Sequence, residues 1–420
     1  MIKIFLIFYN LFLLVFLVPI LLGIALSGKR NRKDFFYCIK ERLVMHNIPQ
    51  MDKNKKTVWI HCASLGEARA VEPMMEKLQG YNIIITTITK SAREYVSKFK
   101  SVAFYSLAPV DIYPFVKKVM MKIKPDMLLL IETEFWPNLI YCANKANIKI
   151  ITVNGRLSKS AFPYYKATSY FWRKFLNLIS RILVRNEQDY ERFVKITGSA
   201  EKVEVTGNIK YDRDWTNEKT DRESLGYGQD DLILIAGSTR KGEEKILLNV
   251  FKKLKNKYDN LKLIIAPRHI SRVNEIINII TEKQAEYSLF SRINKKDNKD
   301  ILILDVFGKL QMLYSVSDIV FIGGSVVKKG GQNPIEASAY AKPAVFGKYM
   351  YNFDSESKLL KEAGASFEVY DENDLQIKID ELLSDKQLRI NMGQKALKIV
   401  EQQTGAVNKN IEIIKKYINE

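Results

Sequence analysis

The sequence is poor in cysteine and histidine, with three of each among 420 residues. The cysteines, Cys38, Cys62 and Cys142, are odd in number and lack metal-ligand spacing, which argues against a disulfide scaffold and a structural zinc site. No cluster of acidic residues with metal-binding spacing stands out, and Asp230-Asp231 is interpreted as a solvated turn. The sequence therefore predicts a reduced catalytic body with no metal and no other cofactor.

Patterns typical of nucleic-acid binding are also missing. There is no zinc-finger spacing, no ribonucleoprotein aromatic motif and no basic recognition helix. Positive charge is nevertheless in excess, with 66 Lys and Arg against 47 Asp and Glu and a formal net charge of +19. Such an excess predicts an anionic partner, and an anionic membrane or a phosphorylated substrate satisfies it better than nucleic acid here.

One long hydrophobic run, IFLIFYNLFLLVFLVPILLGIAL at residues 4–26, stands out from this mixed composition. At about 1.5 Å per residue it can cross a hydrocarbon core of about 30 Å. The basic run GKRNRK follows it, so the positive-inside rule places the rest of the chain in the cytoplasm. We predict a membrane anchor over residues 1–28, either spanning the bilayer or embedded in one leaflet. A cleaved signal peptide is the alternative, although its apolar region is usually only about 7–15 residues long.

Strand-like apolar runs alternate with helix-length amphipathic stretches along the rest of the chain. The first series is TVWIHCAS, NIIITTIT, VAFYSLAP, DMLLLIETE, IKIITVNG, RILVRN and VEVTGN, and the second is LILIAGST, LKLIIAPRH, ILILDV, IVFIGGS and PAVFG. This alternation is typical of parallel βα units. We predict two doubly wound, Rossmann-like α/β domains facing a cleft, over residues 29–212 and 232–420, with a polar connector at 213–231.

In such sheets, ligands bind beyond the carboxyl ends of the strands. In the second half, three turns at strand ends are suited to anions, because glycine permits close approach and helix starts offer free N–H groups. Their candidate phosphate or donor contacts are Ser238, Thr239, Gly323, Gly324 and Ser325, joined by Arg268 in APRH and by GGQNPIEAS at residues 330–338. Glu336 there is either a helix-dipole partner or an acceptor for a ribose.

The first half contributes acidic residues at its strand ends. Glu67 lies in HCASLGEAR, and Glu132 and Glu134 lie in IETEFWPN. Glu67 can be a catalytic acid–base group or merely a favourable residue at a helix start, and the other two can be solvent-exposed. Lys210 follows a glycine turn near the domain boundary. Acids in one half and anion-binding turns in the other are typical of group transfer.

The motifs SLGEARA, ETEFWPNLI, NGRLS, TGNIKYD, GSTRKGEE, APRH and GGSVVKKGGQNPIEA occur in this order. In this respect the chain resembles the 3-deoxy-D-manno-octulosonic acid (Kdo) transferases, over about four-fifths of its length. The resemblance implies a GT-B fold and an inverting glycosyltransferase that moves Kdo from CMP-Kdo to a lipid A precursor (lipid IVA) in lipopolysaccharide core synthesis. It also implies attachment to anionic lipids of the bacterial inner membrane, on the cytoplasmic face, with acceptor binding in the first domain and CMP-Kdo binding in the second.

Carried over residue by residue, the resemblance makes Glu67 the general base and Glu132 and Lys210 transition-state stabilisers. The CMP-binding positions that it implies are Pro267, Arg268, Gly308, Lys309, Leu310, Asn333, Pro334, Ile335 and Glu336. Two departures occur, because many relatives have histidine in place of Gln332 and a histidine-containing turn in place of Arg240-Lys241.

Alternatives remain at this point. Another membrane-bound GT-B enzyme that uses a UDP-sugar fits the same fold, and so does a nucleotide-sugar epimerase, although an epimerase needs no apolar anchor. A non-catalytic module that binds anionic lipid or nucleic acid is a third. His61 is expected to pack at a strand end, whereas His269 is a candidate site residue. An aromatic stripe at residues 162–172 is interpreted as core or as membrane interface.

Overall fold

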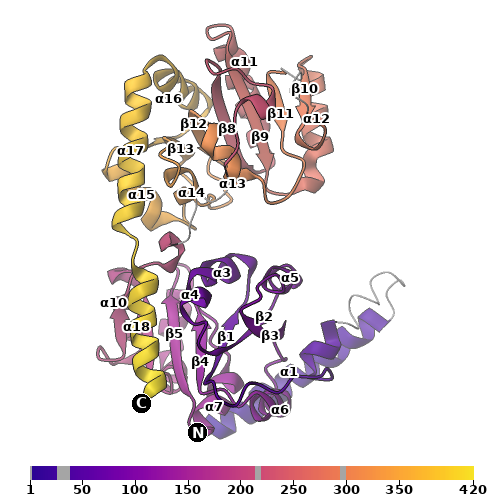
Figure 1. Ribbon diagram of the computed structural model, residues 1–420, viewed down its shortest axis with the longest axis vertical. Helices are drawn as coiled ribbons and strands as arrows, with labels where there is room; N and C mark the ends of the chain where they lie inside the picture. Colours follow the sequence, from indigo (N-terminus) through magenta and orange to yellow (C-terminus); the bar gives the residue numbers. More distant parts are fainter. Residues whose placement is uncertain (1, 26–37, 213–218, 294–298) are drawn as a thin grey trace. The chain divides into compact units, whose positions relative to one another are not determined.

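The computed structural model describes residues 2–25, 38–212, 219–293 and 299–420, with side chains in the first range described only as far as Val15. The chain forms two compact units (Figure 1). The N-terminal unit comprises residues 1–213 and 403–420, and the C-terminal unit comprises residues 214–402. Each is a Rossmann-like α/β unit built on a parallel sheet, which confirms that part of the predicted fold.

The sheet of the N-terminal unit contains seven parallel strands in the order β3-β2-β1-β4-β5-β6-β7. The strands are β1 (Thr57–Cys62), β2 (Asn82–Thr87), β3 (Val102–Leu107), β4 (Met127–Ile131), β5 (Lys149–Gly155), β6 (Arg181–Val184) and β7 (Val203–Val205). All seven lie within the predicted runs. Central strands such as β1, β2 and β4 are buried at every position, because helices cover both faces of a parallel sheet.

The C-terminal sheet also has seven parallel strands, in the order β10-β11-β9-β8-β12-β13-β14. They are β8 (Leu232–Thr239), β9 (Leu261–Pro267), β10 (Tyr287–Leu289), β11 (Ile301–Ile303), β12 (Ile319–Ile322), β13 (Ala344–Gly347) and β14 (Ser366–Val369). Five of these coincide with the predicted runs. The two edge strands, β10 and β14, escaped prediction because they are short and partly exposed, and so lack a continuous apolar run.

Helices connect the strands in both units. Those of the N-terminal unit are α1 (Ile2–Ala25), α3 (Leu65–Ala70), α4 (Glu72–Lys77), α5 (Lys90–Val96), α6 (Tyr113–Ile123), α7 (Pro137–Lys145), α8 (Phe162–Ala167), α9 (Ser169–Leu176), α10 (Glu187–Thr197) and α18 (Ala406–Asn419). Those of the C-terminal unit are α11 (Glu243–Lys255), α12 (Val273–Glu282), α13 (Leu310–Leu313), α14 (Ile335–Ser338), α15 (Asp354–Glu362), α16 (Glu372–Ser384) and α17 (Lys386–Gln402).

Each sheet has one point at which the strand order reverses direction. In the N-terminal sheet it lies between β1 and β4, and in the C-terminal sheet between β8 and β12. The chain leaves these neighbouring strands toward opposite sides, which opens a crevice at their carboxyl ends where ligands of this fold class bind. Glu67 and Glu132 follow β1 and β4, and Arg240 and Gly323 follow β8 and β12.

The last helix, α18, belongs to the N-terminal unit, whereas the sequence analysis assigned all residues after 232 to the C-terminal domain. The physical reason is an apolar face that joins the N-terminal core through Val407, Ile411 and Ile414. The carboxylate of Asp212 accepts the N–H groups of Gly405 and Val407 and so caps this helix. Helical periodicity predicts such a face but not the sheet against which it packs.

The first half of α1 packs on the N-terminal unit by one face. Phe5 contacts Phe171 of α9, with ring centroids 4.1 Å apart, and the Tyr9 hydroxyl donates to Asp111 Oδ2 at 3.1 Å. The other face exposes apolar side chains, namely Ile4, Ile7, Phe8, Leu11, Phe12, Leu14 and Val15. In the part of the chain described with side chains, no helix is long and apolar enough to cross a membrane. The later side chains of the predicted anchor and the GKRNRK run lie outside that part.

We expect Ile414→Ala to lower the free energy of unfolding of the N-terminal unit by about 2–5 kcal/mol, because Ile414 is fully buried and its truncation leaves a cavity. Urea unfolding followed by tryptophan fluorescence measures this change, since three of the four tryptophans lie in this unit. The exposed neighbour Lys415 supplies the control, and Lys415→Ala should change the value by no more than about 0.5 kcal/mol. Equal unfolding midpoints for the two variants would contradict the packing of α18.

Candidate active site

Glu67 lies in the first turn of α3, directly after β1. The Ser64 hydroxyl donates to Glu67 Oε1 at 2.8 Å and accepts the Glu67 N–H at 3.3 Å, while the Ala63 N–H donates to Glu67 Oε2 at 2.7 Å. This reciprocal pattern is a variant of the capping box, in which Glu67 accepts the N–H of the residue before the N-cap Ser64. The helix-start role considered from the sequence is therefore present, and it also fixes the orientation of the carboxylate.

The environment of Glu67 makes it an unusual carboxyl group. Its exposed fraction is 8%. Burial is the main cause that raises the pKa of Glu67 to about 7, and the charge of Glu132 raises it further, against the opposing hydrogen bonds from Ala63 and Ser64. A carboxylate with a pKa near neutrality is suited to accept a proton and to release it again.

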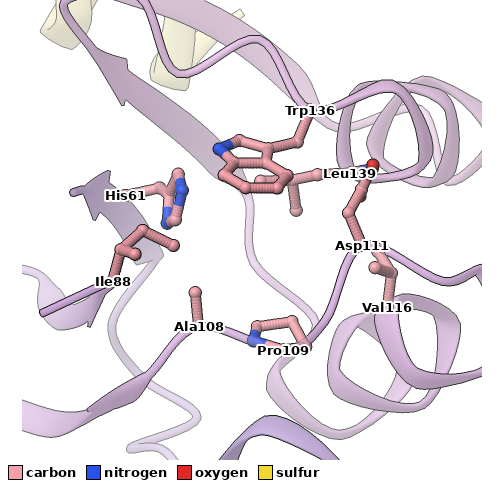
Figure 2. A pocket seen from close by; sticks show the side chains of 8 residues that line it. All are labelled: His61, Ile88, Ala108, Pro109, Asp111, Val116, Trp136 and Leu139. Carbon is pink, nitrogen blue, oxygen red and sulfur yellow. The ribbon is translucent and has the colours of Figure 1, made fainter. Parts of the chain in front are cut away.

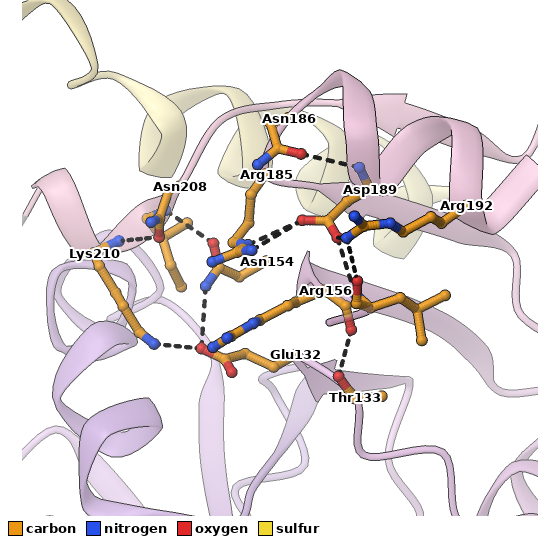
Figure 3. A network of polar contacts seen from close by, with 12 residues as sticks. Glu132, Thr133, Asn154, Arg156, Arg185, Asn186, Asp189, Arg192, Asn208 and Lys210 are labelled. Carbon is orange, nitrogen blue, oxygen red and sulfur yellow. Dashed lines mark hydrogen bonds and ion pairs between the residues drawn. The ribbon is translucent and has the colours of Figure 1, made fainter. Parts of the chain in front are cut away.

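Glu132 has the opposite electrostatic setting (Figure 3). Burial favours its neutral form, but the Lys210 ammonium outweighs this effect and, with Arg185 and Arg156 nearby, holds the pKa of Glu132 below its ordinary value. Lys210 Nζ donates to Glu132 Oε1 at 2.5 Å. The structure thus brings together Glu67, Glu132 and Lys210, the three residues expected to be catalytic.

Asn154 connects this pair to the backbone around it. Its amide nitrogen lies 3.5 Å from Glu132 Oε1, and its carbonyl oxygen accepts the N–H of Ile209 at 3.2 Å. Ile209 begins the 3₁₀ turn Ile209–Asp212, which carries Lys210. Both Glu132 and Asn154 have a φ of 59°, in the left-handed region that few residues other than glycine adopt.

A second buried carboxylate, Asp189, supports the arginines of the site (Figure 3). Arg185 donates to Asp189 Oδ2 through Nε at 3.2 Å and Nη2 at 3.0 Å. Asp189 Oδ1 accepts the N–H of Leu157 at 2.9 Å, and the Arg156 carbonyl accepts from the Thr133 hydroxyl at 2.5 Å. These bonds fix the loop after β5, so Arg156 stays near Glu132.

Figure 2 shows a small, mainly apolar pocket in the N-terminal unit, lined in part by His61, whose Nε2 lies 3.8 Å from Glu134 Oε2. Its lining residues are His61, Ile88, Ala108, Pro109, Asp111, Val116, Trp136 and Leu139. Thr86 Oγ1 lies 3.0 Å from His61 Nδ1, and the ring of His61 stands edge-on to Trp136. Burial lowers the pKa of His61 to about 4, so this histidine is neutral at pH 7 and packs at the strand end.

In the C-terminal unit, the predicted donor-binding turns gather at the carboxyl edge of the sheet. The N–H of Arg268 donates to the Thr239 carbonyl at 3.0 Å, and that of Gly323 donates to the Gly237 carbonyl at 2.8 Å. These bonds join the ends of β8, β9 and β12. Ser238, between them, has a φ of 57°.

Several N–H groups that were expected to face a phosphate have protein acceptors instead. The Glu243 carboxylate, 1% exposed, accepts the N–H groups of Gly324 at 2.6 Å, Ser325 at 3.0 Å and Val326 at 3.1 Å. The Thr239 hydroxyl likewise donates to Glu244 at 2.7 Å. Buried donors need partners, and the chain supplies them itself. These donors therefore have internal acceptors, while the phosphate contacts expected of this turn stay a prediction.

The remaining predicted donor positions lie in loops that open short helices. Gly308 has a φ of 84° and precedes Lys309, the N-cap of α13, which begins at Leu310. Asn333 Oδ1 accepts the N–H of Ile335 at 3.2 Å and so stabilises the start of α14, for which Pro334 is the N-cap. Glu336 follows in the first turn of α14. Burial raises the pKa of the nearby Tyr314 phenol, and the charge of Glu336 raises it further.

Sequence reasoning missed several residues that shape the site. Ser64, Asn154 and Glu243 all hold their neighbours by side-chain hydrogen bonds. A serine three residues before Glu67 is a readable capping-box signal. The role of Glu243 in joining two loops had no such signal, because three of its four partners lie about 80 residues away in sequence.

Comparison with known protein families supplies two matches, one for each half of the chain. Residues 38–213 match the family model described as 3-deoxy-D-manno-octulosonic-acid transferase (kdotransferase). Residues 217–399 match the model described as glycosyl transferases group 1.

Individual relatives agree with this assignment. The chain is 32% identical to a 3-deoxy-D-manno-octulosonic acid transferase of Haemophilus influenzae over 86% of this chain and 87% of the relative. It is 36% identical to a bifunctional glycosyltransferase/methyltransferase of Fusobacterium nucleatum over 76% of this chain, and spans about half of that relative, 51%.

Solved structures support the fold alone, because their sequence identities are low. A glycosyltransferase from Rickettsia africae has a TM-score of 0.60 and 17% identity, covering 87% of this chain and 99% of its own. The UDP-GlcNAc 2-epimerase of Neisseria meningitidis has a TM-score of 0.58 and 15% identity, covering 83% and 99%. From the family match and the Haemophilus relative, this chain belongs to the 3-deoxy-D-manno-octulosonic-acid transferase family and carries a glycosyltransferase group 1 domain.

Proposed function

We propose that the protein transfers Kdo from CMP-Kdo to a lipid A precursor, lipid IVA, with inversion at the anomeric carbon. The observation that carries this proposal is the pairing of Glu67, whose pKa is about 7, with the ionised Glu132–Lys210 pair at the switch point of the N-terminal sheet. Family membership and the names of the relatives support Kdo as the transferred sugar, whereas CMP-Kdo as donor and lipid IVA as acceptor are part of the proposal.

In this mechanism Glu67 is the general base. The acceptor hydroxyl is a poor nucleophile, so a carboxylate must remove its proton as the new glycosidic bond forms. Each carboxylate oxygen of Glu67 accepts one hydrogen bond from the protein and keeps a further lone pair for the acceptor hydroxyl. The raised pKa makes the carboxylate basic enough to take the proton, and burial keeps water away from it.

Glu132 and Lys210 then have distinct roles. The anomeric centre gains positive character as the bond to phosphate breaks, and the ionised Glu132 stabilises such charge. Lys210 keeps Glu132 ionised and is itself held by the turn that Asn154 anchors. Arg268, at the end of β9, stabilises the charge that develops on the departing CMP phosphate. A monophosphate leaving group needs less assistance from a metal ion than a diphosphate.

We further propose that α1 attaches the protein to the cytoplasmic face of the bacterial inner membrane, where its lipid acceptor resides. The apolar face at Ile4, Phe8 and Val15 is exposed, with side chains 59–68% accessible. Burying such a face in the acyl region stabilises attachment. Tyr170 and Lys174 of the neighbouring helix α9 suit the headgroup level, where aromatic and basic side chains are favoured.

A UDP-sugar transferase and a sugar-nucleotide epimerase remain the rival functions, and both occur on this fold. The epimerase neighbour has a TM-score close to that of the glycosyltransferase neighbour, so the fold does not discriminate between them. The family match favours transfer of Kdo. The purified full chain, incubated with CMP-Kdo and tetraacylated lipid A precursor, should give products whose mass reveals both transfer and the number of sugars added. Selective binding and turnover of a UDP-sugar would overturn the proposal.

Replacing Glu67 tests its role as the base. We expect Glu67→Gln to lower the rate of Kdo transfer by roughly 10²–10⁴-fold, because the amide cannot accept the proton. Affinity for CMP, measured by calorimetry, should not change. Glu76→Gln, at an exposed position of α4, is the matched control and should retain full activity. Full transfer activity in Glu67→Gln would instead favour a non-catalytic module.

The electrostatic link between Glu67 and Glu132 can be measured directly. Glu132→Gln removes a negative charge and leaves Lys210 uncompensated, so the pKa of Glu67 should fall from about 7 toward its ordinary value. ¹³C NMR titration of labelled glutamate carboxyl groups, assigned by the loss of a signal in Glu67→Gln, measures this. Glu204→Gln, on the exposed side of β7, should leave the pKa in place. In the wild type, the transfer rate should rise as the pH passes through about 7, because the ionised carboxylate is the base.

Membrane attachment through α1 predicts that Ile4→Glu together with Phe8→Glu weakens binding to vesicles of phosphatidylethanolamine and phosphatidylglycerol at least about tenfold. Flotation of the purified protein with vesicles measures binding. Tyr370→Glu with Ile377→Glu places the same charges at exposed apolar positions of the C-terminal unit and should leave flotation unchanged. Undiminished flotation of the α1 variant would place the attachment elsewhere.

A further inference from the structure

Arg240 occupies the switch point of the C-terminal sheet, although neither the motifs nor the resemblance assigned it a role. It directly follows β8, and the turn beginning at Gly323 directly follows β12, the strand on the other side of the reversal. Ligands of doubly wound sheets bind at this point. Arg240 therefore lies where a ligand of the C-terminal unit is expected.

The buried carboxylate of Glu243 holds the two loops together there. It accepts the N–H of Arg240 at 2.8 Å and the N–H of Gly324 at 2.6 Å. Four backbone donors share this one carboxylate, so their positions are fixed by bonds that are costly to leave unmade. The backbone of Arg240 is thus already ordered, so little backbone entropy is lost when its side chain binds a ligand.

The two departures from the family pattern meet at Gly324. A Cβ atom on Gly324 would lie 3.5 Å from Arg240 Cγ and 3.5 Å from Gln332 Nε2. Gly324 has a φ of 72°, a conformation that glycine adopts without strain. The side chains of Arg240 and Gln332 therefore lie over a bare stretch of backbone, and both belong to one local environment.

His269 orients the guanidinium of Arg240. Arg240 Nη1 lies 2.9 Å from His269 Nε2. Arginine can only donate, so Nε2 must be the accepting, unprotonated nitrogen. Partial desolvation and the charges of Arg240, Arg268 and Arg272 lower the pKa of His269, which keeps the ring neutral at pH 7. His269, a candidate from the sequence, is thus a positioning residue for Arg240.

The charges around Arg240 do not balance within the described residues. Arg272 forms ion pairs with Glu244 at 2.7 Å and Glu275 at 3.1 Å. Among those same residues, neither Arg240 nor Arg268 has a carboxylate within ion-pair distance, and Arg240 Nε is buried without a hydrogen-bond partner. Burial lowers the pKa of Arg240, and the charge of the neighbouring Arg268 lowers it further, against the opposing charge of Glu243. Two neighbouring guanidinium groups with a buried, unused donor are a ready site for an oxyanion.

We propose that Arg240, acting with Arg268, binds an oxyanion of the sugar-nucleotide donor and is a specificity-determining residue of the transfer reaction. This inference rests on the proposed function, because the donor there carries two such groups, a phosphate and the carboxylate of the sugar. Both present two oxygen atoms, on a planar carboxylate or a tetrahedral phosphate, that a guanidinium can contact with two parallel hydrogen bonds. A UDP-hexose has no carboxylate beside its anomeric carbon, so a contact from Arg240 to the carboxylate of the donor would favour an acidic sugar.

The experiment compares Arg240→Gln and Arg240→Lys with Lys241→Gln, which removes the same charge from the adjacent, 83% exposed side chain. Calorimetry gives the Kd for CMP and for free Kdo, and steady-state transfer gives the KM for CMP-Kdo. We expect Arg240→Gln to raise at least one of these constants roughly ten- to hundredfold, as for the loss of a charge-assisted hydrogen bond. Arg240→Lys should recover part of the loss, and Lys241→Gln should stay within about twofold of the wild type.

The three ligands separate the two anionic groups. A higher Kd for CMP identifies the phosphate as the group bound, whereas an unchanged Kd for CMP with weaker binding of Kdo and a higher KM for CMP-Kdo identifies the carboxylate. Thermal unfolding checks that each variant is folded. If the wild type is active and Arg240→Gln has the same Kd and KM values as Lys241→Gln, the role of Arg240 is overturned and the proposed function is not. A folded wild type that neither binds CMP nor transfers Kdo overturns the proposed function as well.

Discussion

Buried carboxylates at the carboxyl ends of parallel strands require hydrogen-bond donors, and this requirement organises both units of the protein. In the C-terminal unit, Glu243 meets it with four backbone N–H groups and so joins the loops after β8 and β12. In the N-terminal unit, Glu132 meets it with Lys210, which comes from a turn 78 residues further along the chain. An unpaired charge in either place would cost several kcal/mol, so each loop is held where its sheet reverses direction. The positions of the side chains on these loops are therefore also restricted.

The same requirement gives different pKa values to Glu67 and Glu132, two carboxyl groups that both follow apolar strands in the sequence. Burial favours the neutral form of both Glu67 and Glu132, but of the two only Glu132 has an ammonium group within hydrogen-bonding distance, and its pKa lies below the ordinary value as a result. The charge kept on Glu132 then raises the pKa of Glu67 further. Two neighbouring acids whose pKa values move apart can divide the roles of base and electrostatic stabiliser. Lys210 therefore acts on Glu67 indirectly. It keeps Glu132 ionised, and the negative charge of Glu132 disfavours ionisation of Glu67.

Much of this arrangement could be predicted from the sequence, but only where the relevant interactions are local or repeated. Twelve strands appear in the sequence as apolar runs. Glu67 comes shortly after one of them, β1, and three residues after Ser64, a spacing that predicts the start of a helix. The edge strands β10 and β14 lack such runs because one side of each is partly exposed. Helix α18 belongs to the N-terminal unit because Ile414 packs in the core of that unit. The spacing of apolar residues in α18 predicts an apolar face but not the unit against which this face packs. Composition also does not reveal that Glu243 accepts the N–H groups of Gly324 and Ser325, the residues predicted to contact a phosphate.

Three of the eight described non-glycine residues with a positive φ lie among the candidate site residues and their hydrogen-bond partners. Glu132, Asn154 and Ser238 adopt φ values of 57–59°, which cost roughly 1–2 kcal/mol each for residues other than glycine. All three lie at the carboxyl ends of strands, and two of them bear side chains of the Glu132–Lys210 network. Replacing such a residue with glycine would relieve the strain but remove the carboxylate or the amide that the network needs. Strain of this kind persists only where surrounding contacts over-determine the conformation. The left-handed conformation of Glu132 is therefore explained by the position of its carboxylate between Lys210 and Asn154, and not by the local sequence.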